Sequence, residues 1–239
     1  LGVYAKEASP QARALATQQL LASTTLDVGV LEGKGSNNWV VPGSNTQSGL
    51  PLLANDPHLG LSAPAVWYFA GLHAPAGQFA DGQAHAALDV VGATLPGLPF
   101  VVLGRTNKAA WGFTNTGPDV QDLYLEALEG KDNYRTPMGQ QAFETRNEVI
   151  KVKGQADVSI KVRDTRHGPV ISDVQPAYAQ FLNMDKYAMA LRWTALDVDN
   201  QTIVAGMEAN FATSVAELRQ AFSKNHSPMQ SVVMADKGG

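Results

Sequence analysis

Residues 35 to 41 read Gly-Ser-Asn-Asn-Trp-Val-Val, and the sequence changes character at this stretch. Before it, residues 24–35 lack hydrophobic periodicity and end in small and charged residues, which is typical of a surface linker. From Trp39 onward, short apolar runs typical of strands begin. The change predicts that Ser36 stands where an accessible linker meets the first strand of a sheet-rich region. The Gly35–Ser36 bond is then open to processing.

On the N-terminal side, residues 10–23 have apolar positions at helical spacing, with Ser9 placed as N-cap and Pro10 at the first helical position. One amphipathic helix is predicted there. On the C-terminal side, sheet dominates, with turn signals between the strand-like runs. These runs are 38–41, 51–55, 66–72, 87–93, 100–104, 109–115, 123–128, 148–154, 158–164, 169–172 and 187–193.

Two runs alternate apolar with polar residues and predict a hairpin, 148–154 paired with 158–164, with one solvated face that carries its Lys and Arg side chains. Near the C-terminus, Ser214 followed by Glu217 forms a capping box. Val215, Leu218 and Phe222 share one face of the helix that it begins. Residues 230–236 then predict a buried strand.

Two classes of side chain have ordinary structural interpretations. The tryptophans lie in strand-like runs and are predicted mainly to be core residues, although an acyl-chain pocket would also be apolar and aromatic; they are Trp39, Trp67, Trp111 and Trp193. Three of the five histidines are predicted at exposed or loop positions, namely His85, His167 and His226.

Composition excludes several classes of function. The 239 residues carry 18 basic and 22 acidic side chains, a formal net charge of −4, so no basic field exists to hold nucleic acid or an anionic membrane. The absence of cysteine excludes disulfides, thiolate metal sites and a Cys nucleophile. The most apolar stretch, 95–104, is far shorter than the ~20 residues that span a bilayer. Because the chain begins and ends in mid-pattern, we expect a segment of a longer protein.

Chemistry must therefore come from Ser, Thr, His or carboxylates. The chain has no Gly-x-Ser-x-Gly nucleophile motif, and no two histidines stand at the i, i+4 spacing of a helical zinc site. If the Gly35–Ser36 bond were cut, Ser36 would carry its own α-amine, whose ordinary pKa of about 7.7 to 8 suits a general base at neutral pH. One residue would then supply nucleophile and base. The dipeptide alone favours an ordinary Gly-Ser turn.

Four motifs extend the interpretation: GSNNWVV from Gly35, LLANDPHL at 52–59, GATLPGLP at 92–99 and AWGFTNTGPDVQDLY at 110–124. In this order and spacing, they resemble the start of the β-chain of penicillin acylases and acyl-homoserine lactone acylases, which are N-terminal nucleophile hydrolases. The resemblance covers Ser36 to the C-terminus. It implies an α+β, four-layer αββα fold, incomplete in this segment. Residues 1–35 would be the end of the α-chain plus spacer, and residues 36–239 the N-terminal part of the β-chain.

The resemblance also assigns roles to residues. It makes Ser36 the nucleophile of an amide hydrolysis that proceeds through an acyl-enzyme, and His58 a group that orients the serine and its amine. Asn115 falls where the family's backbone N–H points into the oxyanion hole, although relatives commonly carry an apolar side chain there. Ser231 stands where relatives carry the Asn that supplies the second oxyanion donor. A hydroxyl is a shorter, single donor, so Ser231, Gln230 or Asn115 could fill that role.

By the same resemblance, Asp119, Gln121 and Asp122 match a structural calcium site, with two carboxylates and a backbone carbonyl as hard oxygen ligands. An acidic turn exposed to solvent is the alternative. No organic cofactor is implied. The expected partners are a small acyl-amide substrate and the rest of the α- and β-chains, with neither nucleic acid nor membrane. The expected location is the periplasm.

The leading hypothesis is thus an amidohydrolase that deacylates an acyl-homoserine lactone or a penicillin-type compound, and the motifs at 52–59 and 92–99 favour the lactone side. The rival is a catalytically inactive β-rich binding or structural domain that keeps the fold. Ser231 in place of Asn favours that rival. A Ser–His–Asp hydrolase that uses another serine is a third hypothesis, and the missing nucleophile motif counts against it.

Overall fold

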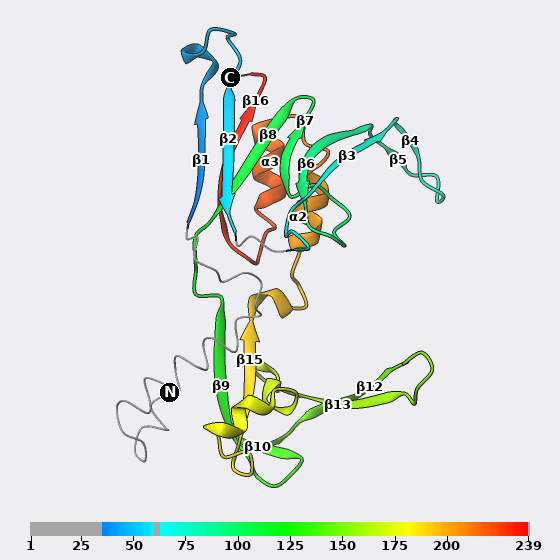
Figure 1. The fold of residues 1–239 in the computed structure, drawn as a ribbon, viewed down its shortest axis with the longest axis vertical. Helices are drawn as coiled ribbons and strands as arrows, with labels where there is room; N and C mark the ends of the chain where they lie inside the picture. The colour runs from blue at the N-terminus through cyan, green and yellow to red at the C-terminus, as the bar shows by residue number, and fades with distance from the viewer. Residues whose placement is uncertain (1–34, 60–62, 239) are drawn as a thin grey trace. The chain divides into compact units, whose positions relative to one another are not determined.

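The computed structural model describes residues 35–59 and 63–238. They form two compact units, one made of residues 35–118 with 197–238 and the other of residues 119–196 (Figure 1). The helix predicted at 10–23 and the linker before Gly35 lie outside the described residues.

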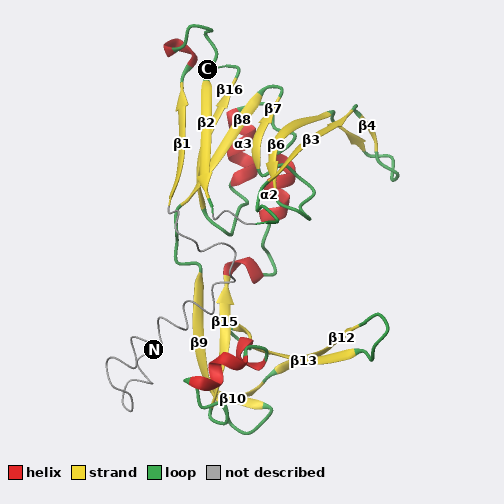
Figure 2. Ribbon diagram, in the orientation of Figure 1, coloured by secondary structure: helices red, strands yellow, loops and turns green. Residues whose placement is uncertain are grey.

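A five-stranded antiparallel sheet forms the centre of the larger unit (Figure 2). In spatial order its strands are β16 (Gln230–Asp236), β8 (Ala109–Asn115), β7 (Leu103–Thr106), β6 (Leu88–Thr94) and β3 (Tyr68–Ala74). The short strands β4 (Gly77–Gln78) and β5 (Ala84–His85) pair with each other in the connection that leads from β3 to β6. The predicted strands of this unit are confirmed, except that β7 begins at Leu103 and not at Phe100.

Two helices, α2 (Thr202–Ala209) and α3 (Val215–Phe222), pack on one face of this sheet. Trp111 of β8 and Leu218 of α3 are fully buried in the core between the sheet and the helices. The ring of Phe113 packs edge-on against that of Phe222, with 5.1 Å between the ring centroids. Helix α2 approaches through small residues, Ala205 and Ala209. Burial of this apolar surface is the main stabilising contribution on that face.

The helix predicted near the C-terminus is confirmed as α3, and one of the two hydrogen bonds of its capping box differs from the expected pattern. Ser214 Oγ accepts the backbone N–H of Glu217 at 3.2 Å, as expected. The Glu217 carboxylate, however, accepts from the backbone N–H and the hydroxyl of Thr213, at 2.6 and 2.9 Å, one residue before the N-cap. Helix α2 was not predicted. Neither of these helices, nor any other in the described ranges, is long and apolar enough to cross a membrane.

The opposite face of the sheet carries a two-stranded antiparallel ribbon of β1 (Gly35–Val41) and β2 (Leu52–His58), joined through the 3-10 helix η2 (Gly43–Asn45). Because side chains alternate along a strand, Gly112 points away from the helices that Trp111 contacts. A Cβ at Gly112 would lie 2.6 Å from Cβ of Asn55 in β2, so the ribbon packs directly on this face.

Helices, sheet and ribbon form three layers, in keeping with an α+β class, while the four-layer arrangement stays a prediction. The alternation also decides which tryptophans are buried. Trp111 faces the helices and is a core residue, as predicted. Trp39 faces away from the sheet and is 52% exposed, so its prediction as a core residue is wrong.

The smaller unit consists of short antiparallel pairs. Strand β9 (Gln121–Ala127) pairs with β15 (Tyr187–Trp193), and β10 (Asn133–Thr136) with β11 (Gly139–Ala142). A three-stranded sheet contains β12 (Glu144–Ile150), β13 (Val158–Thr165) and β14 (Gly168–Pro169). The 3-10 helices are η3 (Ile171–Asp173), η4 (Pro176–Gln180) and η5 (Thr194–Leu196). Buried aromatic and apolar side chains form two small cores, with Tyr134, Phe143, Val170 and Ala188 in one and Tyr178, Leu182 and Met189 in the other.

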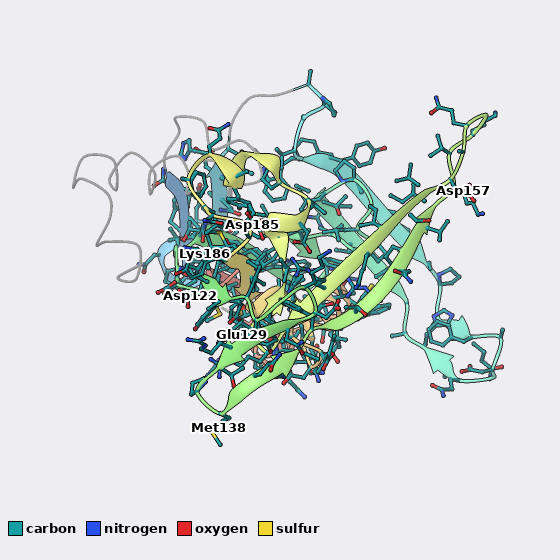
Figure 3. All side chains as sticks on the ribbon, turned by 90° about the horizontal axis from the view of Figure 1, so that it is seen from below. Asp122, Glu129, Met138, Asp157, Asp185 and Lys186 are labelled. Carbon is teal, nitrogen blue, oxygen red and sulfur yellow. The ribbon has the colours of Figure 1, made fainter. Side chains whose placement is uncertain are left out.

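The predicted hairpin exists as β12 paired with β13, but two details were wrong. Strand β12 ends at Ile150, and residues 151–157 form the loop, in which Lys151 and Asp157 form an ion pair. Asp157 lies at the far end of the hairpin (Figure 3). Every residue of β12 is exposed, so this strand has no buried face in the described part of the chain. The hairpin therefore presents Val149 and Ile150 to solvent.

Candidate active site

Ser36 lies second in β1, half-buried, opposite Pro57 of β2. The side chain of Asn38 donates to the backbone carbonyl of Ser231 in β16 at 3.4 Å, so Asn38 faces the five-stranded sheet. Residues two apart on a strand point the same way, and Ser36 therefore faces the sheet as well. The local sequence thus directs the candidate nucleophile into the unit and Trp39 out of it.

His58 ends β2 and lies opposite Gly35 in the ribbon. Its Nδ1 is 3.1 Å from the backbone oxygen of Gly35, and its Nε2 is 3.2 Å from Oδ2 of Asp56. A carbonyl and a carboxylate both accept hydrogen bonds, so both contacts are satisfied when the imidazole carries two protons. The ring therefore contacts the carbonyl of the Gly35–Ser36 peptide bond, the bond that the sequence marks for processing.

Asn115 is the last residue of β8 and lies opposite Gln230, the first residue of β16. Its side-chain oxygen accepts the backbone N–H of Gly117 at 3.0 Å, which forms an Asx turn that leads the chain out of the strand. The side chain of Asn115 is thereby held in a turn, while the predicted role concerns its backbone N–H.

Ser231 lies opposite Thr114 of β8 and is exposed. Val232 and Met234 pack on the helix side of the sheet, so alternation places Ser231 on the ribbon side, where Ser36 also points. Gln230 falls on the helix side with Val232. Of the three donors that the sequence left open, Ser231 has the side chain on the face of the ribbon.

The predicted calcium ligands belong to the smaller unit. Asp119 is exposed in the connection before β9, and Gln121 and Asp122 begin that strand, opposite Trp193 and Arg192 (Figure 3). Two exposed carboxylates and a backbone carbonyl are donors of the kind that a hard cation takes. They supply only part of the six to eight oxygens that calcium requires. Within 35–59 and 63–238, no group of three or more His, Cys, Asp or Glu side chains gathers around a common point.

Of the three histidines predicted at exposed or loop positions, His167 and His226 lie outside the strands, as predicted, and His85 lies in β5. His167 lies in the turn between β13 and β14, with its ring stacked on Tyr124 at 3.7 Å and Nδ1 2.7 Å from Oε1 of buried Glu126. His85 is half-buried in β5, where its ring packs against Phe79 at 4.8 Å. His226 is also half-buried, and its backbone N–H donates to Thr202 Oγ1. All three have structural contacts of their own.

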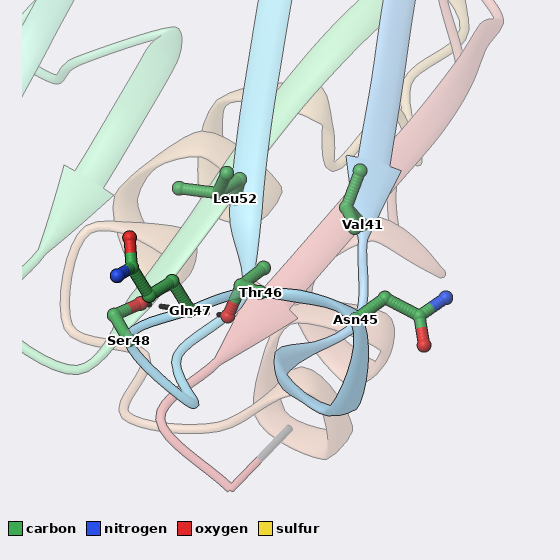
Figure 4. A pocket seen from close by; sticks show the side chains of 6 residues that line it. All are labelled: Val41, Asn45, Thr46, Gln47, Ser48 and Leu52. Carbon is green, nitrogen blue, oxygen red and sulfur yellow. Dashed lines mark hydrogen bonds between the residues drawn. The ribbon is translucent and has the colours of Figure 1, made fainter.

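Two hollows open on the larger unit. One, of about 540 Å³, lies over the loop that joins β1 to β2 and is lined by Val41, Asn45, Thr46, Gln47, Ser48 and Leu52 (Figure 4). It is at the end of β1 opposite to Ser36, so it does not adjoin the candidate nucleophile. The other, of about 390 Å³, lies beside β3 and the 94–100 turn and includes Tyr68, Leu72 and Phe100.

Sequence reasoning missed Asn55, three residues before His58. Its carboxamide makes three hydrogen bonds to the backbone, two of them to β8 and one to β1. Its partners on β8 are 58 residues away, so no local pattern points to them. The signal that was available is an amide side chain among apolar residues of a strand-like run.

A family model described as penicillin amidase matches residues 3–239. Acyl-homoserine lactone acylase QuiP of Pseudomonas aeruginosa is 30% identical over 229 residues, which cover 93% of this chain and 25% of that protein. The penicillin acylase 2 proenzyme of Pseudomonas sp. strain SE83 is 34% identical over 72% of this chain and 21% of that protein. The solved structure of thermostable penicillin G acylase from Alcaligenes faecalis is similar with a TM-score of 0.62 and 30% identity, covering 84% of this chain and 33% of that chain.

The chain spans about a quarter of the length of the curated relatives that it matches. The match nevertheless covers nearly all of its own residues, and it includes each of the four motifs that the sequence singled out. This chain belongs to the penicillin amidase family.

Proposed function

We propose that the protein carrying this chain is an amidohydrolase that deacylates a small amide, with Ser36 as an N-terminal nucleophile freed by self-cleavage at the Gly35–Ser36 bond. The observation that carries this proposal is the placement of Ser36. It faces the sheet near the start of β1, and the carbonyl of the preceding residue lies against the ring of His58.

This contact supports self-cleavage at the Gly35–Ser36 bond. The Ser36 hydroxyl attacks the Gly35 carbonyl carbon, and an N–H of His58 donates to the carbonyl oxygen that becomes negative. The hydroxyl proton passes to the peptide nitrogen, the C–N bond breaks, and the nitrogen leaves as the α-amine of Ser36 while the Gly35 carbonyl stays bound to Oγ as an ester. Hydrolysis of the resulting ester releases the chain that ends at Gly35. The division then falls where the sequence predicts it, with residues 1–35 as the end of an α-chain and residues 36–239 as the start of a β-chain.

In turnover, the hydroxyl of Ser36 attacks the substrate amide and its proton passes to the α-amine. That proton then goes to the leaving amine, and an acyl-enzyme remains on Ser36. Water activated by the same α-amine hydrolyses the ester and releases the acid. The backbone N–H of Asn115 and the hydroxyl of Ser231 are the proposed oxyanion donors, of which one well-placed donor contributes about 3 kcal/mol.

The names of the relatives guide the substrate class. Two of them are acyl-homoserine lactone and penicillin acylases, and we propose a compound of one of these two kinds. Calcium bound through Asp119, Asp122 and the Gln121 carbonyl would have a structural role in the smaller unit, because it would neutralise the charges of the two carboxylates. We propose a periplasmic location for the processed protein.

The second candidate is an inactive domain that keeps the fold. Ser231 supports it, because a hydroxyl is shorter than the carboxamide that relatives carry and donates a single hydrogen bond.

Intact-mass analysis of the complete gene product, together with hydrolysis assays on an N-acyl homoserine lactone and a penicillin, tests both candidates. The wild type should yield a chain that begins at Ser36 and should release acid. Ser36→Ala should stay uncut and inactive. The control is Ser44→Ala, in the loop at the other end of β1, which should behave as the wild type. Efficient cutting in Ser36→Ala would remove Ser36 as the agent, and a cut wild type without hydrolysis would favour the inactive domain.

A further inference from the structure

The side chain of Asn55 holds the ribbon to the sheet by a two-sided contact. Its Nδ2 donates to the backbone oxygen of Phe113 at 2.8 Å, and its Oδ1 accepts the backbone N–H of the same residue at 3.0 Å. The amide of Asn55 therefore pairs with Phe113 as a neighbouring strand would. Nδ2 also donates to the backbone oxygen of Asn37 at 3.1 Å, so one side chain joins β1, β2 and β8.

The sheet has space for this contact only because residue 112 is glycine. A Cβ there would lie 2.6 Å from Cβ and 2.8 Å from Cγ of Asn55. Distances below 3.0 Å are not tolerated between such atoms, so any larger residue would push the ribbon away. The glycine and the asparagine thus fit each other across the two layers.

The atoms that Asn55 holds adjoin those of the proposed chemistry. Asn37 follows the nucleophile Ser36 directly, and Phe113 stands two residues before Asn115, whose backbone N–H is the proposed oxyanion donor. A second side-chain link to the sheet, from Asn38 of β1 to the Ser231 carbonyl, is longer at 3.4 Å. The short hydrogen bonds of Asn55 therefore set the separation between β1 and the end of β8.

We propose that Asn55 is a positioning residue that fixes the Ser36 hydroxyl relative to the oxyanion donor on β8, acting through Asn37 and Phe113 and without touching the substrate. This inference rests on the proposed function of Ser36. Misplacement of a reacting group by about 1 Å costs about 100-fold in rate. The chemical step should therefore depend on Asn55 far more than substrate binding does.

Asn210 provides a matched control. It makes the same two-sided contact with a backbone, since its Oδ1 accepts from Val101 N at 2.7 Å and its Nδ2 donates to Val101 O at 2.8 Å. It also donates to the Gly206 carbonyl at 3.0 Å. Asn210 is buried, follows α2 and makes no contact with β1, β2 or β8 through these bonds. Its loss should affect stability alone.

The experiment compares Asn55→Asp with Asn210→Asp in the complete gene product. Each change keeps the shape and removes both donated hydrogen bonds. Self-cleavage rate, kcat and KM are measured and normalised to the folded fraction from circular dichroism. Asn55→Asp should lower kcat and the self-cleavage rate about 100-fold, with KM within threefold of the wild type. Asn210→Asp should lower Tm and leave kcat per folded molecule within twofold.

If Asn55→Asp does not fold, Gly112→Ala displaces the contact instead, and Gly206→Ala is its control, since that Cβ would meet the Phe100 ring at 2.3 Å. The same fall in kcat is expected for Gly112→Ala only. Equal kcat values in the Asn55 and Asn210 variants, or in the two glycine variants, would overturn the positioning role. Ser36→Ala is measured alongside. If Ser36→Ala is cut and active, or if the wild type is uncut or inactive, the proposed function fails as well. If Ser36→Ala is inactive and Asn55→Asp is fully active, only the positioning role is refuted.

Discussion

Gly168 offers a sharp test of the smaller unit. It begins β14 with φ of +132°, a backbone conformation open essentially to glycine alone, and a Cβ there would lie 2.2 Å from the backbone oxygen of Leu191 in β15. Gly168→Ala therefore introduces backbone strain of about 1 to 3 kcal/mol and an overpacking cost of about 1 to 3 kcal/mol. A backbone oxygen in a paired strand has little freedom to move aside, so both costs should be felt.

The matched variant is Gly154→Ala, in the loop between β12 and β13. Gly154 also has positive φ, +78°, but a Cβ there would meet no atom within 4 Å, so only the left-handed strain of about 1 to 2 kcal/mol applies. Scanning calorimetry of the complete gene product should show a lower Tm for Gly168→Ala than for the wild type, because the two costs together lower the free energy of unfolding by about 2 to 6 kcal/mol. The shift for Gly154→Ala should be at most half as large. Equal shifts would refute the close approach of Gly168 to β15.

Two further predictions concern charge. The pKa of Asp236 is lowered from its ordinary value of 3.8 because the carboxylate accepts the backbone N–H groups of Val215 and Gly238, at 2.7 and 2.8 Å. Its stabilising effect is therefore present above that ordinary value and is lost as pH falls through the lower folded value, so Asp236→Asn should flatten this part of an acid-unfolding curve. Replacing Asp119 and Asp122 together by Ala should lower Tm and abolish any rise in Tm on adding calcium, since only the folded state binds the ion. If the double variant responds to calcium as the wild type does, these residues form an ordinary acidic turn and not a calcium site.

Local pattern predicted most of the longer strands because they are bounded by turn residues and rich in β-branched and aromatic side chains. It missed the short polar strands β10 and β11, and the strand that it predicted at 169–172 is wrong at residues 171 and 172, which belong to a 3-10 helix. Helix α2 was missed for a physical reason. Its apolar side chains Ile203, Val204 and Met207 are largely exposed, while its buried face consists of Ala205 and Ala209. Its N-cap, Gln201, makes no capping hydrogen bond. Periodicity of large apolar residues therefore indicated no face, and no start signal marked the helix.

The candidate site was predictable only in part. The linker-to-strand change located Ser36, and the motif order located His58, but which way each side chain points depends on how β1 and β2 pair. Trp39 was wrongly predicted to be buried because the alternation of side chains divides a strand into two faces and does not say which face is buried. Contacts such as that of Asn55 with Phe113 join residues far apart in sequence and become visible only in the folded chain.

The pairing of β1 with β2 restricts how this sequence can vary in length. The strands pair without a bulge from Gly35 opposite His58 to Val41 opposite Leu52, and the side-chain period is two. One residue inserted between Trp39 and Val41 would turn the serine outward and Trp39 inward, whereas insertions in the exposed loop over residues 44–50 would leave both where they are. Among descendants of this gene, length changes should therefore collect in that loop, and the strand should keep a fixed count of residues between the serine and the loop.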